Sequence, residues 1–203
     1  MASTAAPYGL RAVNRVDGLP YAGETRQFLI TPAGYASNLF YGQVVKIGTD
    51  GYIQLVTETG ATGSAFPAGT IGVFVGCSYV NAQGQTVFSQ YYPANSLNAV
   101  AYVIDDDRAV FQVQADGAVP QTALGANVFF AAAQNGTNGS GGSTTSGNSL
   151  SAVSATYQSA TAAFRIVGFA QGPFSAVGDA KTDLLVKFNI AQHSYTNATG
   201  TSD

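Results

Sequence analysis

Apolar and polar residues alternate with a period of two along much of this chain, and this periodicity constrains the fold more than any other feature. In Ala109–Gln114 the alternation is clear from Val110 or Phe111 onward, and Leu184–Ile190 is strongly patterned. A period of two places apolar side chains on one face of a strand, whereas a helix needs them three and four residues apart. Because no long stretch has the helical spacing, we predict an all-β protein.

Turn residues separate the alternating segments at short intervals. Between Gly72–Val80 and Thr86–Tyr92, the sequence Asn81–Gln85 predicts a turn, and therefore a hairpin. About ten short strands of this kind are typical of antiparallel sandwiches and barrels, so we expect a barrel-like or sandwich-like antiparallel fold. The other expected strands are Arg26–Thr31, Gly51–Val56, Ala101–Ile104, Arg108–Ala115, Asn127–Ala132, Ala163–Ala170 and Asp183–Ile190.

Two pairs of segments form a weak internal sequence repeat. Gly42–Val45 is followed by Gly72–Gly76, and Gly125–Val128 is followed by Arg165–Phe169. One explanation is a duplicated small β-barrel, which would give two small β subdomains. The other is chance, since short apolar segments recur in any β protein. The sequence favours neither explanation.

The changes in pattern divide the chain into four parts. Residues 1–25 have little periodicity, so we expect an extended N-terminal arm that orders only against a partner. Residues 26–98 form a first β subdomain, and residues 99–195 form a second. Within the second, the Gly/Ser-rich loop 135–149 should be exposed and mobile. Residues 196–203 are expected to form a flexible C-terminal tail.

The charge content narrows the range of partners. Only 9% of the 203 residues are charged and the net charge is −3. A monomer in water usually carries more charge, so this composition indicates surfaces that pack against other protein. The eight basic residues are scattered, which argues against binding to DNA or RNA. The apolar segments are far too short to span a bilayer and no signal peptide is recognisable, so we expect a soluble protein that folds in a reducing cytosol, without membrane contact.

The acidic segment Asp105–Asp107 is the strongest polar cluster in the sequence. One interpretation is a cation site, because hard cations need several oxygen ligands. The favoured alternative is an acidic turn between two strands, since adjacent aspartates do not converge on one ion and no spaced ligand pattern follows. His193 is the only histidine and could act in a Ser-His-Asp triad, but no Gly-x-Ser-x-Gly sequence is present. A surface or interface histidine is the favoured interpretation.

The remaining reactive side chains also point away from catalysis. Glu24 and Glu58 are the only glutamates, and nothing in the pattern places two carboxylates across a cleft. Cys77 is the only cysteine, so it can form neither an internal disulfide nor a cysteine-based zinc site, and its apolar neighbours predict a buried, inert thiol. The Gly-rich loop lacks the Gly-Lys-Ser/Thr ending of a phosphate loop. We therefore predict a non-enzymatic protein with no catalytic, cofactor-binding or metal-binding residues and no cofactor.

Several segments, taken in order, carry a resemblance to a known family. They are Phe40–Lys46, Ile71–Tyr79, Val87–Pro93, Asp106–Asp116, Leu124–Asn127, Phe164–Phe169, Val186–Asn189 and His193–Tyr195. This order resembles a family of virion structural proteins of tailed bacteriophages, and in particular head decoration (cement) proteins. The resemblance extends from about Leu10 to Tyr195 and rests on packing and turn motifs. Asp107 stands where a proline is expected, and the Gly/Ser loop is unusually simple.

The resemblance implies a function, a partner and a location. It implies that the protein binds the outer surface of the shell formed by the major capsid protein and stabilises that shell. It also implies a homotrimer at a site where capsid subunits meet, a place on the exterior of the capsid in the virion, and assembly in the host cytoplasm.

Three other functions compete with this one. The protein could be a different virion component, such as a tail or neck protein. It could be a carbohydrate-binding or receptor-binding module, with binding residues Tyr52, Tyr79, Tyr91 and Tyr92. It could also be a hydrolase that uses His193. Copy number in the virion distinguishes a tail or neck protein from a head protein, because a head lattice needs hundreds of copies. A glycan array tests for carbohydrate binding, and loss of a hydrolytic activity in a His193→Ala variant would indicate a hydrolase.

Overall fold

The chain folds into two antiparallel sheets that are not closed into a barrel, which gives a sandwich-like, all-β architecture in this computed structural model. The structure describes residues 4–135, 141–172 and 175–201. Within these residues there is no α-helix, and helical structure is limited to the 3-10 turns η1 and η2. The elements are β1 (Arg11–Arg15), β2 (Arg26–Leu29), β3 (Val44–Ile47), β4 (Ile53–Leu55), β5 (Thr70–Val80), β6 (Thr86–Ser89), β7 (Leu97–Ile104), β8 (Ala109–Gln114), η1 (Gln121–Ala123), β9 (Asn127–Val128), β10 (Phe164–Phe169), β11 (Asp183–Phe188) and η2 (Ser194–Thr196).

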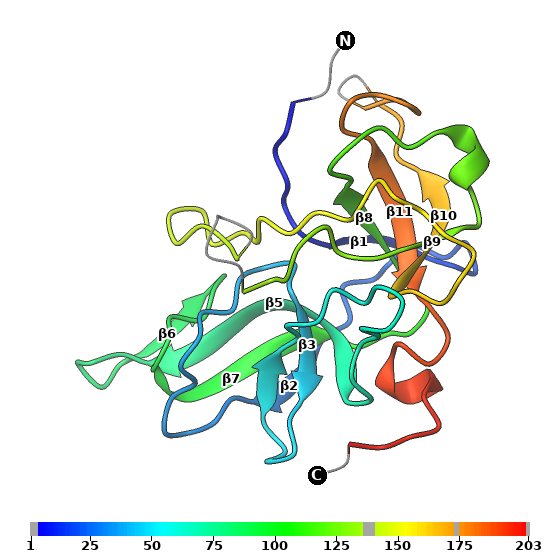
Figure 1. The fold of residues 1–203 in the computed structure, drawn as a ribbon. Helices are drawn as coiled ribbons and strands as arrows, with labels where there is room; N and C mark the ends of the chain where they lie inside the picture. The colour runs from blue at the N-terminus through cyan, green and yellow to red at the C-terminus, as the bar shows by residue number, and fades with distance from the viewer. Residues whose placement is uncertain (1–3, 136–140, 173–174, 202–203) are drawn as a thin grey trace.

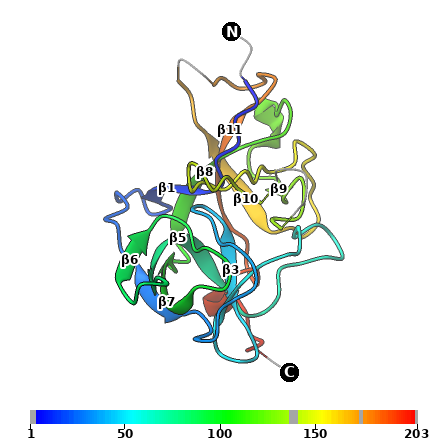
Figure 2. The same ribbon diagram turned by 90° about the vertical axis from the view of Figure 1, so that its left-hand side faces the viewer.

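Each sheet joins strands that are far apart in the chain. Sheet A has the order β1-β8-β11-β10-β9. Sheet B has the order β2-β7-β5-β3-β4, and β6 pairs with the far end of the long strand β5. In Figures 1 and 2, sheet B lies toward the C-terminus and sheet A toward the N-terminus. No helix in the described residues is both long enough and apolar enough to cross a lipid bilayer.

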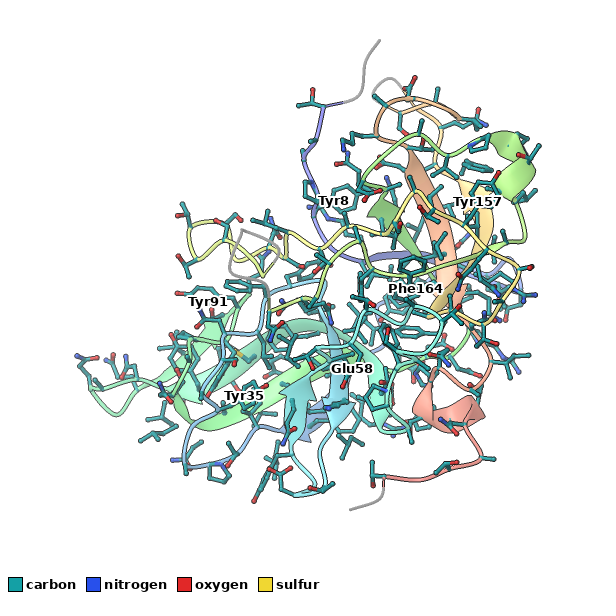
Figure 3. All side chains as sticks on the ribbon, viewed as in Figure 1. Tyr8, Tyr35, Glu58, Tyr91, Tyr157 and Phe164 are labelled. Atoms are coloured by element: carbon teal, nitrogen blue, oxygen red, sulfur yellow. The ribbon has the colours of Figure 1, made fainter. Side chains whose placement is uncertain are left out.

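The first hydrophobic core lies between the two sheets and is dominated by phenylalanine rings. Phe164 is completely buried, and its ring centroid lies 5.2 Å from that of Phe130 and 5.3 Å from that of Phe188. Figure 3 shows Phe164 at the junction of the two sheets. Val44 and Val73 of sheet B belong to the same buried cluster. Edge-to-face rings of this kind contribute stability beyond the burial of their area.

The second core covers the opposite face of sheet B. It contains Phe74 and Cys77 of β5 and is closed by loop residues that include Leu39 and Tyr92, both completely buried. The buried Tyr92 hydroxyl has a hydrogen-bond partner, because it donates to the carbonyl of Ser96 at 2.8 Å. Sheet B is therefore packed on both faces near β3, but on only one face near β6.

The predicted hairpin at Asn81–Gln85 is confirmed. The Gly84 N–H donates to the carbonyl of Asn81 at 2.9 Å, and the Asn81 side chain accepts from the N–H groups of Gln83 and Gln85. Gly84 has a φ of +77°, a conformation that glycine adopts without strain. The turn brings β6 antiparallel to β5, with Ser78 opposite Phe88.

The N-terminal segment differs from the expected arm. Arg11–Arg15 form β1, which pairs with β8 about 100 residues away along the chain and is an edge strand of sheet A. Leu10 is 1% exposed and belongs to the core between the sheets, and its N–H donates to the carbonyl of Gly42 at 2.9 Å. Burial of Leu10 orders this part of the chain without a partner, which corrects the expectation for these residues.

The Gly/Ser-rich segment also differs from the expected loop over the part that the structure describes. Ser149 and Gly147 are buried, and Tyr41 exchanges backbone hydrogen bonds with both of them. The buried Gln43 side chain donates to the carbonyl of Gly141 at 2.9 Å. Residues 141–149 are therefore fixed to the loop before β3, because Gly and Ser allow a close approach that larger side chains would prevent. The expectation for 136–140 lies outside the described residues.

The predicted boundary between two subdomains falls inside a strand. Residues 98 and 99 both lie in β7, which is inserted between β2 and β5 of sheet B. The chain passes from sheet B to sheet A only after Ile104. In each pair of segments of the weak internal repeat, the two segments form neighbouring strands. Val44 pairs with Val73, and Val128 pairs with Phe164.

Candidate interaction surface

Two of the three aspartates of the acidic turn, Asp105 and Asp106, contact different partners. Asp105 accepts a hydrogen bond from the Tyr195 hydroxyl at 2.6 Å and forms an ion pair with Arg26 at 3.1 Å. Asp106 forms an ion pair with Arg15 at 3.0 Å, and its other oxygen accepts from the N–H of Arg108 at 2.9 Å. In the described part of the chain, no three His, Cys, Asp or Glu side chains are grouped so that they could hold a metal ion. These contacts favour the interpretation of Asp105–Asp107 as a turn.

His193 lies in the interior rather than on a surface or at an interface, which corrects the expectation for this residue. It is 1% exposed, and its ring packs edge-on against Phe188 with centroids 5.4 Å apart. Its Nδ1 accepts a hydrogen bond from the backbone N–H of Tyr195 at 3.2 Å, so it caps η2. Burial lowers the pKa of the imidazole below its usual value. The described residues place no serine hydroxyl in a hydrogen bond with it.

The other reactive side chains are dispersed. Cys77 is 1% exposed, and burial raises the pKa of its thiol to about 12, as expected for an inert cysteine. Glu24 lies in the exposed segment before β2, whereas Glu58 follows β4 and lies 3.9 Å from Lys46.

The four tyrosines proposed for carbohydrate binding do not form one exposed surface. Tyr92 is completely buried in the second core, and Tyr79 packs against the same core. Tyr91 stacks on Phe40 with ring centroids 5.7 Å apart (Figure 3). Tyr52 lies in the turn before β4, on the far side of β3 from these residues. The aromatic rings mainly fill the interior, as apolar bodies with a polar tip commonly do.

A different surface is exposed on sheet B, on the face opposite the second core. Directly opposite residues in antiparallel strands point to the same face. The register therefore aligns Leu29 of β2, Val100 of β7, Ser78 of β5 and Phe88 of β6 in one row across four strands. Phe88 is 76% exposed and Leu29 is 58% exposed. We refer to these four residues as the cross-strand row.

A shallow hollow of about 680 Å³ lies beside the cross-strand row. Phe88 lines it, together with Tyr102 and Val75 of the same sheet face and with Arg11 and Tyr41 from the N-terminal half of the chain. Gly76 lies at its base, opposite Tyr102 in the sheet register. An open depression of this shape, lined by both apolar and polar residues, suits contact with another protein surface better than enclosure of a small molecule.

The edge of sheet B next to the cross-strand row is also open. Among the residues that the structure describes, β2 pairs only with β7, and residues 26, 28 and 30 face that strand, since the Ile30 N–H donates to the carbonyl of Ala99. The backbone groups of Gln27 and Leu29 therefore point outward from the edge. An open edge of this kind can accept a strand from a neighbouring chain.

The residues of this surface were not among those predicted from the sequence. Phe88 lies in a strand that was predicted, but alternation alone does not say which face of a strand is covered. The signal that could have identified it is Thr86–Ser89, where Val87 and Phe88 are adjacent apolar residues and so must point to opposite faces.

Comparison with known proteins adds no relative: no protein-family model, no curated protein and no solved structure matches this chain.

Proposed function

We propose that the protein is a non-catalytic structural protein of a tailed-phage virion that binds the outside of the capsid shell as a homotrimer and stabilises it. The observation that carries the proposal is the cross-strand row, which crosses four strands, contains the apolar residues Leu29, Val100 and Phe88, and leaves Leu29 and Phe88 exposed in the single chain. Exposed apolar patches on otherwise polar proteins commonly mark sites of contact with other proteins. The family resemblance supplies the identity of the partner, the major capsid protein.

The low charge content supports the same proposal. Charged side chains make up 9% of the chain, and none of the four residues in the cross-strand row is charged. Desolvation of charged groups opposes association, so a neutral surface is easier to bury. The outward-facing backbone groups of β2 would add hydrogen bonds to such a contact. Three copies around one axis would bind neighbouring capsid subunits together, and multivalency would strengthen weak single contacts.

The test is addition of purified protein to heads of the encoding phage from which the protein has been removed. We expect saturable binding of hundreds of copies per head, and a mass of three chains for the unbound protein by sedimentation. A Leu29→Ser, Phe88→Ser double variant should remain folded and lose binding. A Leu19→Ser variant is the matched control, because Leu19 is 55% exposed but lies in the turn after β1. Absence of binding by a stable monomer overturns the proposal, and a handful of copies per virion points to a tail or neck protein instead.

A further inference from the structure

Arg165 and Lys187 lie directly opposite each other on neighbouring central strands of sheet A. β10 pairs with β11 so that Arg165 faces Lys187 across the ladder. Their neighbours along the strands, Phe164, Val186 and Phe188, point into the core between the sheets. Since side chains alternate along a strand, the two basic side chains share the outer face of sheet A. Like charges placed directly opposite each other destabilise a sheet.

Neither basic group is neutralised by a carboxylate in the described part of the chain. Four other basic residues, Arg15, Arg26, Lys46 and Arg108, lie within 4 Å of an Asp or Glu oxygen. Arg165 instead donates from Nε to the side-chain oxygen of Asn127 at 3.2 Å. This bond orients the guanidinium and leaves its two terminal nitrogens without a partner among the described residues. Lys187 has no hydrogen bond or ion pair there.

Two hollows with exposed apolar side chains adjoin the basic pair. The larger, of about 490 Å³, is lined by Arg165, Leu124 and Tyr157 and by no acidic residue. Leu124 is 49% and Tyr157 is 39% exposed, and Figure 3 shows Tyr157 at the outer side of sheet A. The smaller, of about 220 Å³, is lined by Lys187 and by Ile190, which is 77% exposed. Asp107 and Arg108 also line this second hollow, and Arg108 lies 3.9 Å from a carboxylate oxygen of Asp17.

We propose that the Arg165–Lys187 pair is a docking site for an acidic segment of a partner protein, with apolar side chains on either side of its carboxylates. The guanidinium fork matches a carboxylate geometrically, and a second carboxylate would remove the repulsion between the two cations. Leu124 and Tyr157 would receive an apolar side chain of the same segment. The positive charges of Arg165 and Lys187 therefore favour an acidic segment as the ligand of this site.

Other occupants fit the charges less well. In a second copy of this chain, Asp105 and Asp106 of the acidic turn are already paired with Arg26 and Arg15, so two adjacent carboxylates of that turn are not available to the site. A nucleic acid needs a broad basic field, whereas this site has two cations in a chain of net charge −3. The proposal goes beyond the capsid function and does not depend on it, since it concerns a different sheet face and any partner with an acidic segment.

The test uses two blocked synthetic peptides, Gly-Phe-Asp-Gly-Asp-Leu-Gly and the same peptide with Asn at both Asp positions, titrated into the full-length protein and followed by NMR. We expect the acidic peptide to shift amide signals of residues 124–127, 157–159, 165–167 and 187–190, and the Asn peptide to bind about fivefold or more weakly at low salt. Lys187→Gln should weaken binding of the acidic peptide about fivefold, whereas Arg11→Gln, which removes one exposed basic charge elsewhere, should not change it.

A second measurement separates binding from a structural role. Because the repulsion is present in the free protein, Lys187→Gln should raise the melting temperature of the unbound protein by about 1–3 °C. A fall in melting temperature would mean that Lys187 supports the fold and would overturn the proposal. Equal binding of the two peptides, shifts at other residues, or an equal effect of Arg11→Gln would also overturn it.

Discussion

The side chain of Gln134 forms two hydrogen bonds with the backbone of Val44, from the Val44 N–H to Oε1 at 2.8 Å and from Nε2 to the Val44 carbonyl at 3.1 Å. Nε2 also donates to the carbonyl of Val56 at 2.8 Å. Gln134 is completely buried, and its amide bonds to the backbone at the first residue of β3 and at the residue that follows β4. The bonds join Gln134 to residues 90 and 78 positions earlier in the chain, next to the core between the two sheets.

We expect Gln134→Ala to lower the free energy of unfolding by about 2–4 kcal/mol, because it leaves buried backbone groups without partners. Urea denaturation checks this, with an unchanged slope indicating that compactness is unaffected. Gln83→Ala is the control, since Gln83 is exposed in the hairpin turn, and it should change stability by less than about 0.5 kcal/mol. Equal midpoints for the two variants would contradict the role of Gln134.

Two truncations separate residues 2–5 from the part of the N-terminal segment that contains Leu10 and β1. Deletion of residues 2–5 should leave stability nearly unchanged, since Thr4 and Ala5 are exposed and the backbone contact of Thr4 is a single bond from Gln114 at 3.2 Å. Deletion through residue 15 removes β1 and the buried Leu10, and loss of a buried leucine alone costs about 2–5 kcal/mol. Thermal melts of both proteins check this, and a fully stable deletion of 15 residues would contradict the burial of this segment.

We expect the single histidine to make the folded chain less stable in mild acid. Burial lowers the pKa of His193, so the unfolded chain binds a proton at this site more readily than the folded chain. The stabilisation is therefore complete above the unfolded pKa of about 6.5 and is lost as the pH falls from there toward the lower folded pKa. Urea unfolding at pH 7.5 and at pH 5.0 should show a smaller loss in His193→Gln than in the native sequence. The same loss in both would exclude His193 as the source.

Cys77 should not react with thiol reagents in the folded protein. Its Sγ lies 3.5 Å from the carbonyl of Tyr91, and burial raises the pKa of the thiol to about 12, so little thiolate is present at pH 8. Iodoacetamide should modify it only after denaturation, as followed by mass spectrometry. Rapid modification in native buffer would mean that β5 and β6 separate readily.

The sequence alone determined those features that depend on neighbouring residues. Alternation in segments such as Ala109–Gln114 predicted the strands, and Asn81–Gln85 predicted the hairpin, because side-chain direction and turn conformation are set within a few residues. The inert Cys77 and the turn at Asp105–Asp107 were also predicted from their immediate sequence neighbours.

Only the tertiary structure decided which segments meet. Arg11–Arg15 has polar residues at most positions and becomes a strand because β8 offers it an edge about 100 residues away. The sequence around Gln134 does not distinguish it from an exposed loop glutamine, and only the folded chain places it beside Val44. The register between strands leaves Phe88 exposed and places Arg165 opposite Lys187. Alternation within one strand does not specify this register. The energy that selects these pairings comes from burial of the shared phenylalanine core, and that core exists only when distant segments pack together.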